Sequence, residues 1–172
     1  MIKIIVAYDK NRGIGLSNDL PWRIPGELRW VFETTTKVQD SNKRNALLMG
    51  RNTWESLPAD RRPLKDRLNI IVSRTLQLPA DDNILCFSSL DKAIDYVQSA
   101  PDIEDCFIFG GAQIYEQALE KGFVSKILAT EISNEYEVDT FFPEIPSDFS
   151  IESKEEKLFD DFKITRFVYS LG

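Results

Sequence analysis

The chain has 172 residues, of which 42% are hydrophobic and 28% charged, as in ordinary soluble globular domains. Its formal net charge of −7 argues against a general nucleic-acid binder, because such a surface repels phosphate. The chain contains no histidine, which excludes imidazole acid–base chemistry and His-ligated zinc. Proton transfer must therefore use carboxylates, Tyr, Lys or water, and we expect no metal.

The amino-terminal run MIKIIVAYDK is too short for a signal sequence with a cleavage site. No run approaches the roughly 18 apolar residues that a membrane helix needs. Cys86 and Cys106 both lie in apolar, strand-like runs, which favours buried free thiols over a disulfide. We therefore expect a cytoplasmic protein that does not contact a membrane.

The first half of the chain predicts four strands and one helix. Strands are predicted at residues 2–7, 46–49, 68–72 and 84–87, and several are apolar throughout, as in a sheet covered on both faces. Pro25 fits the first turn of a helix that carries Leu28, Val31 and Phe32.

The second half continues this alternation. Apolar residues at 90, 93, 94 and 97 predict a helix, with Ser88 and Asp91 placed like a capping box. Another helix is predicted after Gly110–Gly111, and strands at 106–109, 126–132 and 163–169; the last alternates, which suits an antiparallel addition. This order favours a single α/β domain, residues 1–172, with a mostly parallel central sheet.

Glu27 falls within the apolar stripe formed by Ile24, Leu28 and Val31 on the first predicted helix. As a first-turn glutamate it would be stabilised by the helix dipole and would need no other role. As a buried carboxylate it would need a hydrogen-bonding partner or would become neutral. The preceding segment, residues 12–22, is glycine-rich and ends in Pro-Trp; it could cover a ligand or be a plain surface loop.

Three strand ends carry groups that suit a phosphate. Gly50-Arg51 follows one predicted strand, Ser73-Arg74 the next, and Gly110-Gly111 a third. Glycine at such a turn lets backbone N–H groups approach an anion, and ligands of open α/β sheets bind at the carboxyl ends of strands. Because none of these matches the GxGxxG fingerprint, simple tight turns remain the alternative.

Seven segments, in order and in register, resemble the dihydrofolate reductase family over nearly the whole chain. The resemblance implies a three-layer α/β fold with an eight-stranded, mainly parallel sheet, an antiparallel C-terminal strand and flanking helices. It also implies NADPH-dependent reduction of 7,8-dihydrofolate to tetrahydrofolate, which supports one-carbon metabolism and thymidylate synthesis, by a monomer that could bind antifolates such as methotrexate or trimethoprim. The matching segments are IIVA (4–7), GLSNDLPW (15–22), MGRNTWES (49–56), RPLKDR (62–67), NIIVSR (69–74), FGGAQIY (109–115) and DTFFP (139–143).

The resemblance assigns Glu27 as the pocket acid, whose carboxylate accepts two hydrogen bonds from the amidine-like edge of the pterin ring. Thr130 would hydrogen-bond this acid, and Trp22 would help to hold a water near it. Arg67 matches the arginine that binds the α-carboxylate of the glutamate tail, with Arg62 nearby, although a solvated charge is the alternative for Arg67. The apolar walls would be Ile5, Leu28, Val31, Leu57 and Phe109.

Residues 11–21 resemble the family's mobile loop, which would close over the two reacting rings with Leu20 inside it. Asp139 would tie a second loop to this one, and Tyr115 would pack near the nicotinamide. Val31 stands where the family commonly has Phe, so packing on the benzoyl ring is the clearest departure.

For the cofactor, the resemblance implies that Ala7 and Ile14 hold the nicotinamide carboxamide through their backbones. Arg51 would join Ser73 and Arg74 in binding the 2′-phosphate and so select NADPH. Gly110–Gly111 matches the family's cis peptide, and Ala112-Gln113 replaces the Gly-Arg of some members. The remaining cofactor residues would be Gly15, Asn18, Gly50, Asn52, Thr53, Ile114 and Tyr115.

Two alternatives stay open from the sequence. One is the pyrimidine reductase of riboflavin synthesis, which has the same fold and also uses NADPH, but gives no reason for the spacing from Pro-Trp to Glu27. The other is a non-catalytic protein that binds NADPH or a pterin.

Overall fold

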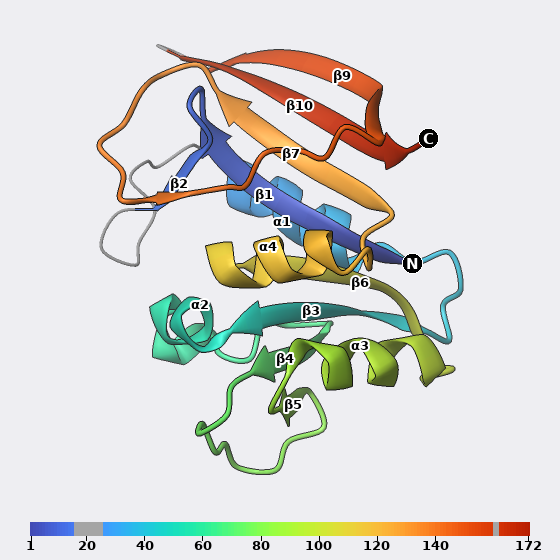
Figure 1. Ribbon diagram of the computed structural model, residues 1–172. Coiled ribbons are helices and arrows are strands. Elements are labelled where there is room, and N and C mark those ends of the chain that lie inside the picture. The colour runs from blue at the N-terminus through green and yellow to red at the C-terminus, as the bar shows by residue number, and fades with distance from the viewer. Residues whose placement is uncertain (16–25, 160–161) are drawn as a thin grey trace.

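An eight-stranded sheet runs through the molecule (Figure 1). The computed structural model describes residues 1–15, 26–159 and 162–172. Strands from β5 to β7 pair in parallel, and β10 pairs antiparallel with both β7 and β9. In spatial order the strands are β5 (Ile84–Phe87), β4 (Leu68–Val72), β3 (Arg44–Gly50), β6 (Ile103–Gly110), β1 (Ile2–Asp9), β7 (Lys126–Ile132), β10 (Phe162–Leu171) and β9 (Phe149–Phe159).

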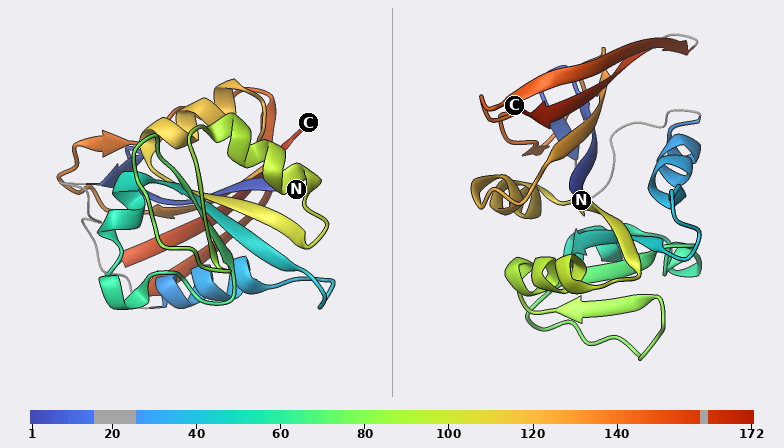
Figure 2. Two further views of the ribbon diagram at one scale, coloured as in Figure 1. Left: turned by 90° about the horizontal axis from the view of Figure 1, so that it is seen from below. Right: turned by 90° about the vertical axis from the view of Figure 1, so that its right-hand side faces the viewer.

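Helices cover both faces of this sheet and make three layers (Figure 2). The helices α1 (Glu27–Thr36) and α2 (Arg51–Ser56) pack on one face, and α3 (Leu90–Ser99) and α4 (Ala112–Glu120) on the other. A short 3-10 helix, η1 (Ala59–Arg61), follows α2. None of the helices in the described ranges is long and apolar enough to span a membrane.

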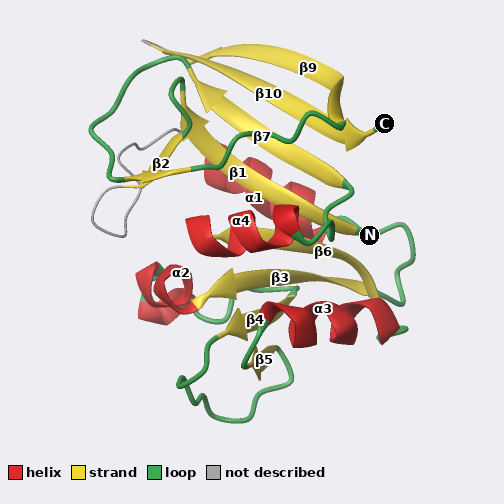
Figure 3. Cartoon of the chain, viewed as in Figure 1, coloured by secondary structure: helices red, strands yellow, loops and turns green. Residues whose placement is uncertain are grey.

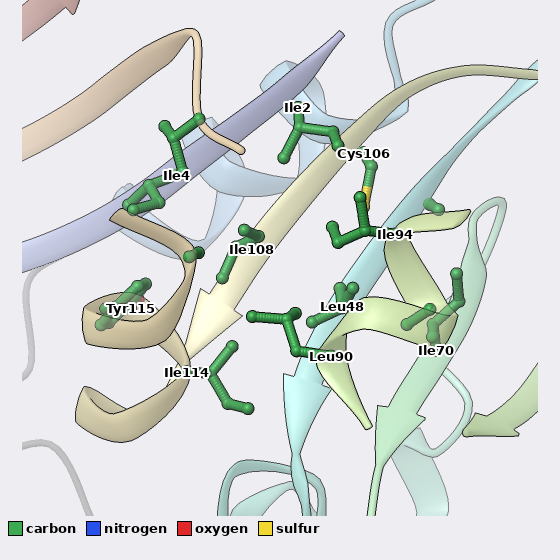
Figure 4. Packing of buried hydrophobic residues seen from close by; sticks show 14 of the residues in the cluster. Ile2, Ile4, Leu48, Ile70, Leu90, Ile94, Cys106, Ile108, Ile114 and Tyr115 are labelled. Carbon is green, nitrogen blue, oxygen red and sulfur yellow. The ribbon is translucent and has the colours of Figure 1, made fainter. Parts of the chain in front are cut away.

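The core is divided by the sheet because successive side chains of a strand point to opposite faces. Ile4, Leu48 and Ile108 pack against α3 and α4 (Figure 4), whereas Ile5 and Leu47 pack on the side of α1 and α2. Burial on both faces explains why these strands are apolar throughout, and it confirms the predicted mainly parallel sheet.

A second, two-stranded sheet lies beside the carboxyl end of β1, formed by β2 (Gly13–Gly15) and β8 (Thr140–Phe141) (Figure 3). The Asp139 amide donates to the Gly15 carbonyl at 2.9 Å, so the implied tie between the two loops is confirmed. Buried Asp9 braces the same junction, because its carboxylate accepts from the Asn11, Gly13 and Tyr136 amides at 2.9, 2.8 and 3.1 Å.

Two features differ from the sequence predictions: three strands and one helix cap. Strands β2, β8 and β9 were not predicted, since the first two are very short and β9 is a polar edge strand. Ser89, not Ser88, caps α3, because its hydroxyl accepts from the Lys92 amide at 3.2 Å.

The cysteines are both free, as predicted, but only one of them is buried. Burial raises the pKa of Cys106 to about 12, whereas Cys86 is exposed because β5 is an edge strand with one side open.

Candidate active site at the α1 face of the sheet

The first turn of α1 places Glu27 against the sheet. Gly26, the N-cap, has a φ of 82°, a left-handed conformation that glycine adopts at little cost. The Glu27 side chain is buried, with 8% of its surface exposed, so the buried-carboxylate interpretation holds. The predicted inward stripe is wrong for Leu28, which is 69% exposed; the helix instead packs through Trp30 and Val31.

Arg166, on β10, is the partner of Glu27. Its Nη2 donates to Glu27 Oε2 at 2.9 Å, and its guanidinium carbon lies 4.3 Å from the centroid of the Trp30 ring. Sequence analysis missed this residue. The alternation of β10 carried the signal, because Ile164 and Arg166 are both buried two positions apart and therefore share a face.

Thr130 lies directly opposite Arg166 in the register of β7 and β10. Its hydroxyl is buried without a hydrogen-bond partner in the described part of the chain, and the same is true of Arg166 Nε. The implied hydrogen bond from Thr130 to Glu27 is therefore not formed in this structure. The Glu27 carboxylate is paired with Arg166 instead.

Apolar side chains from separate elements form a cluster that meets the Glu27–Arg166 pair at Trp30. Ile5 of β1, Phe109 of β6 and Leu57, which follows α2, belong to one cluster with Trp30 and Val31 of α1. Four of the five predicted wall residues therefore lie in the same cluster, and exposed Leu28 projects from the same helix.

Arg67 occupies a second polar site beneath α1. It is 4% exposed, which excludes the solvated-charge alternative, and its guanidinium carbon lies 5.1 Å from the centroid of the Phe32 ring. Its Nε and Nη1 donate to Lys65 O at 2.8 Å and Thr35 Oγ1 at 2.9 Å, both neutral oxygens. Burial lowers the pKa of Arg67, as expected for a positive charge removed from water. Such a charge favours an anionic ligand.

Arg62 directly follows η1 and contacts α2. Its guanidinium carbon lies 5.6 Å from the centroid of the Trp54 ring, so the chain between η1 and β4 presents two arginines held on aromatic rings.

The carboxyl ends of β3 and β6 meet at the starts of α2 and α4. Neither N-cap, Gly50 or Gly111, has a side-chain capping bond. A Cβ on Gly50 would lie 3.9 Å from both Gly110 O and Gly111 N, so the two strand ends touch there. The Gly110–Gly111 peptide is cis, as implied. Thr53 borders these glycines, since its Oγ1 would lie 3.5 Å from a Cβ on Gly110.

The end of β4 is tied to the start of α2. Arg51 donates from Nη1 to Thr75 Oγ1 at 3.0 Å and from Nε to Glu55 Oε1 at 2.6 Å. The Ser73 hydroxyl accepts from the Thr75 and Leu76 amides at 3.3 and 3.1 Å, and Arg74 is exposed. The structure thus gathers the three groups predicted to bind a 2′-phosphate on two adjoining strand ends.

The remaining predicted residues are distributed as follows. Tyr115 is buried and donates from its hydroxyl to Ile5 O at 2.9 Å, and burial raises its pKa above the usual range. Ala7 and Ile14 are half-buried on β1 and β2. At α4, Ile114 is buried, Ala112 half-buried and Gln113 exposed, as is Asn52 on α2. Asn18, Leu20, Trp22, Ile24 and Pro25 lie outside the described residues.

A buried acid therefore lies on one face of a mainly parallel sheet whose strand ends carry groups that suit a phosphate, an arrangement typical of α/β enzymes that bind a nucleotide cofactor. The sequence model described as dihydrofolate reductase matches residues 1–170. The dihydrofolate reductase of Aedes albopictus is 39% identical over 93% of this chain and 88% of its own, and that of Candida albicans 43% identical over 80% and 73%. The bifunctional dihydrofolate reductase-thymidylate synthase of Glycine max is 38% identical over 87% of this chain and 29% of its own.

The chain belongs to the dihydrofolate reductase family. It is an oxidoreductase that acts on dihydrofolate with a nicotinamide cofactor, which decides against the pyrimidine reductase alternative.

Proposed function

We propose that residues 1–172 form one monomeric, cytoplasmic domain that reduces 7,8-dihydrofolate to 5,6,7,8-tetrahydrofolate with NADPH. The observation that carries this proposal is the buried Glu27 carboxylate in an apolar cluster, with buried Arg67 on the same side of the sheet. One acid and one cation under a single helix match a substrate with a hydrogen-bond-donating ring at one end and a carboxylate at the other.

The substrate contacts follow from these two groups. Glu27 binds the 2-amino group and ring N–H of the pterin and fixes the plane of the ring. Arg67 binds the α-carboxylate of the tail with its remaining N–H donors, because a guanidinium carries five and two are engaged by described residues. Arg62 adds positive charge beside it. The walls are Ile5, Leu28, Val31, Leu57 and Phe109, with Thr130 behind the acid.

The strand ends fit a phosphorylated nicotinamide cofactor. The helix starts after Gly50 and Gly111, which have no side-chain cap, offer backbone N–H groups to a pyrophosphate. Arg51, Ser73 and Arg74 suit a 2′-phosphate, which favours NADPH. The other proposed contacts are Ala7, Ile14, Gly15, Asn18, Asn52, Thr53, Gly110, Ala112, Gln113, Ile114 and Tyr115.

When bound, the cofactor supplies a hydride. The protein's part is to orient the pterin through Glu27 and to exclude water with Ile5 and Phe109. Tyr115 holds the backbone of β1 in place at Ile5 through its hydrogen bond to Ile5 O. Leu20 and Trp22, on the predicted mobile loop, complete the enclosure and hold the water through which a proton reaches N5 of the ring.

The loss of NADPH absorbance in the presence of dihydrofolate tests this function directly. Oxidation should require both compounds, and NADPH should be preferred over NADH by at least about a hundredfold, since charge-assisted contacts contribute about 1.5–3 kcal/mol each. Equal efficiency with the two cofactors would contradict the 2′-phosphate assignment. An absence of oxidation would favour the non-catalytic binding protein. Methotrexate and trimethoprim are expected to compete with dihydrofolate.

A further inference from the structure

The acid proposed to bind the ring already has a cationic partner inside the protein. Arg166 Nη2 lies 2.9 Å from Glu27 Oε2, and each of the two residues has 8% of its surface exposed. Trp30 holds the guanidinium from above at 4.3 Å, an arrangement that stabilises a cation over a ring. The buried pair therefore carries no net charge, in contrast to a lone carboxylate.

Within residues 1–15, 26–159 and 162–172, the strand neighbours of Arg166 do not alter this balance. Across β7 its neighbour is Thr130, which is neutral. Across β9 its neighbour is Glu155, but that carboxylate is exposed and lies 3.7 Å from Lys157 Nζ, so water and a second cation screen it.

Two buried polar atoms next to the acid are left without partners in the described residues, Thr130 Oγ1 and Arg166 Nε. A buried donor or acceptor of this kind is costly unless a bound molecule satisfies it. These atoms indicate that the ligand's ring edge meets Arg166 and Thr130 as well as Glu27.

We propose that Arg166 is a specificity-determining residue that makes the Glu27 pocket prefer a neutral ring over a cationic one. The cationic class is the 2,4-diaminopyrimidine ring, protonated where it meets the acid. The inference rests on the proposed function, because Glu27 must be the acid that binds the ring.

The physical reason is the weak screening of charges in a buried site. A lone buried carboxylate attracts a cationic ring strongly, but here Arg166 already supplies the opposite charge. A protonated ring would place a second positive charge beside the guanidinium. A neutral ring edge avoids this repulsion and still donates to Glu27, because a carboxylate has about four acceptor positions and, among the described residues, Arg166 occupies one.

Folate and aminopterin form a matched pair of probes, because they differ only in a 4-oxo or a 4-amino group on the ring. Their dissociation constants can be measured by tryptophan fluorescence titration with wild type and Arg166→Met. We expect aminopterin to gain on folate by at least about tenfold in the variant, a change of about 1.4 kcal/mol in relative binding. Arg166→Lys loses the stacking on Trp30 but keeps the charge, so both ligands could weaken while their ratio should stay within about threefold of wild type.

Lys163→Met is the control, since it removes a charge from the same strand at an exposed pair with Glu156 and should leave both constants unchanged. A shift of both ligands by the same factor in Arg166→Met would overturn the proposal and leave Arg166 a structural residue. If wild type bound neither ligand, the proposed function itself would fail, whereas binding with an unchanged ratio would count against Arg166 alone.

A second measurement serves if Arg166→Met does not fold. Aminopterin binding to wild type can be followed as pH rises through the ring's own titration, with folate in parallel. Its affinity should hold as the ring becomes neutral. A loss of about tenfold per pH unit, specific to aminopterin, would mean that the pocket selects the cation and would overturn the proposal.

Discussion

Two buried arginines lie beneath the same helix, and they differ in what they bind. Arg166 stacks on Trp30 and is neutralised by Glu27, whereas Arg67 stacks on Phe32 and donates to neutral oxygens of Lys65 and Thr35. The first charge is balanced inside the protein. The second feels the charge of the neighbouring Asp66 but donates to neutral oxygens of the described residues, so it can still bind an anion.

The different partners of the two arginines suit the two ends of a long ligand that lies along one helix. An arginine held by neutral acceptors keeps its charge available, so it can bind a carboxylate directly. An arginine already paired with an acid acts on the ligand indirectly, through the charge of that acid.

Breaking the paired site should have the largest effect. In Glu27→Gln, turnover at neutral pH should fall by orders of magnitude, because the amide cannot accept both ring hydrogen bonds, while NADPH binding stays nearly intact. The orphaned Arg166 should also reduce the free energy of unfolding by about 3 kcal/mol, measurable in urea. Glu33→Gln, at an exposed pair with Arg29 on the same helix, is the control. Wild-type turnover at pH near neutral would rule out the role of Glu27.

Breaking the unpaired site should affect one end of the ligand alone. Arg67→Leu should raise the KM for dihydrofolate by about a hundredfold, the effect of losing a charge-assisted contact of about 2.7 kcal/mol. Binding of a pterin without the glutamate tail should change little, and titrations with both ligands separate the two effects. Exposed Arg61→Leu is the matched control. Equal losses for both ligands would mean that Arg67 only supports the fold.

Arg74 is an exposed arginine, so its effect on ligand binding should be weaker than that of the two buried arginines. Arg74→Ala should weaken NADPH binding by about tenfold and barely change that of NADH, since solvent screens the contact that is lost. Fluorescence titration with both cofactors measures this. Parallel weakening of the two would place Arg74 away from the 2′-phosphate.

The smallest effect is expected between the two arginines, at Val31. Valine leaves room beside the ligand's benzoyl ring, and Leu28 does not fill it, because that side chain is 69% exposed. Val31→Phe should therefore tighten methotrexate severalfold through added aromatic contact, with little change for NADPH. Unchanged or weaker methotrexate binding in a titration would show that the site has repacked around Leu57.

Features that depend on residues close together in the sequence were predicted more accurately than features that depend on distant residues. The strands at 68–72, 84–87 and 126–132 were predicted with the bounds that the structure gives. Burial on both faces explains this best for residues 68–72, which are buried along almost the whole strand. Strand β9 was missed because an edge strand with exposed faces carries no such pattern. The inward direction of Leu28 was wrong because the start of α1 shifts the buried face to Glu27 and Trp30.

The sequence by itself determined the alternation of strands and helices, the family and the presence of an acid in an apolar stripe, since all three depend on residues close together along the chain or on their order. Only the tertiary structure decided which cation that acid meets. Glu27 and Arg166 are separated by 139 positions, and their contact requires the pairing of β10 with β7 and the packing of α1 on that face. Register between distant strands is fixed by the whole core rather than by any local pattern, so the charge of the pocket could be read only from the folded chain.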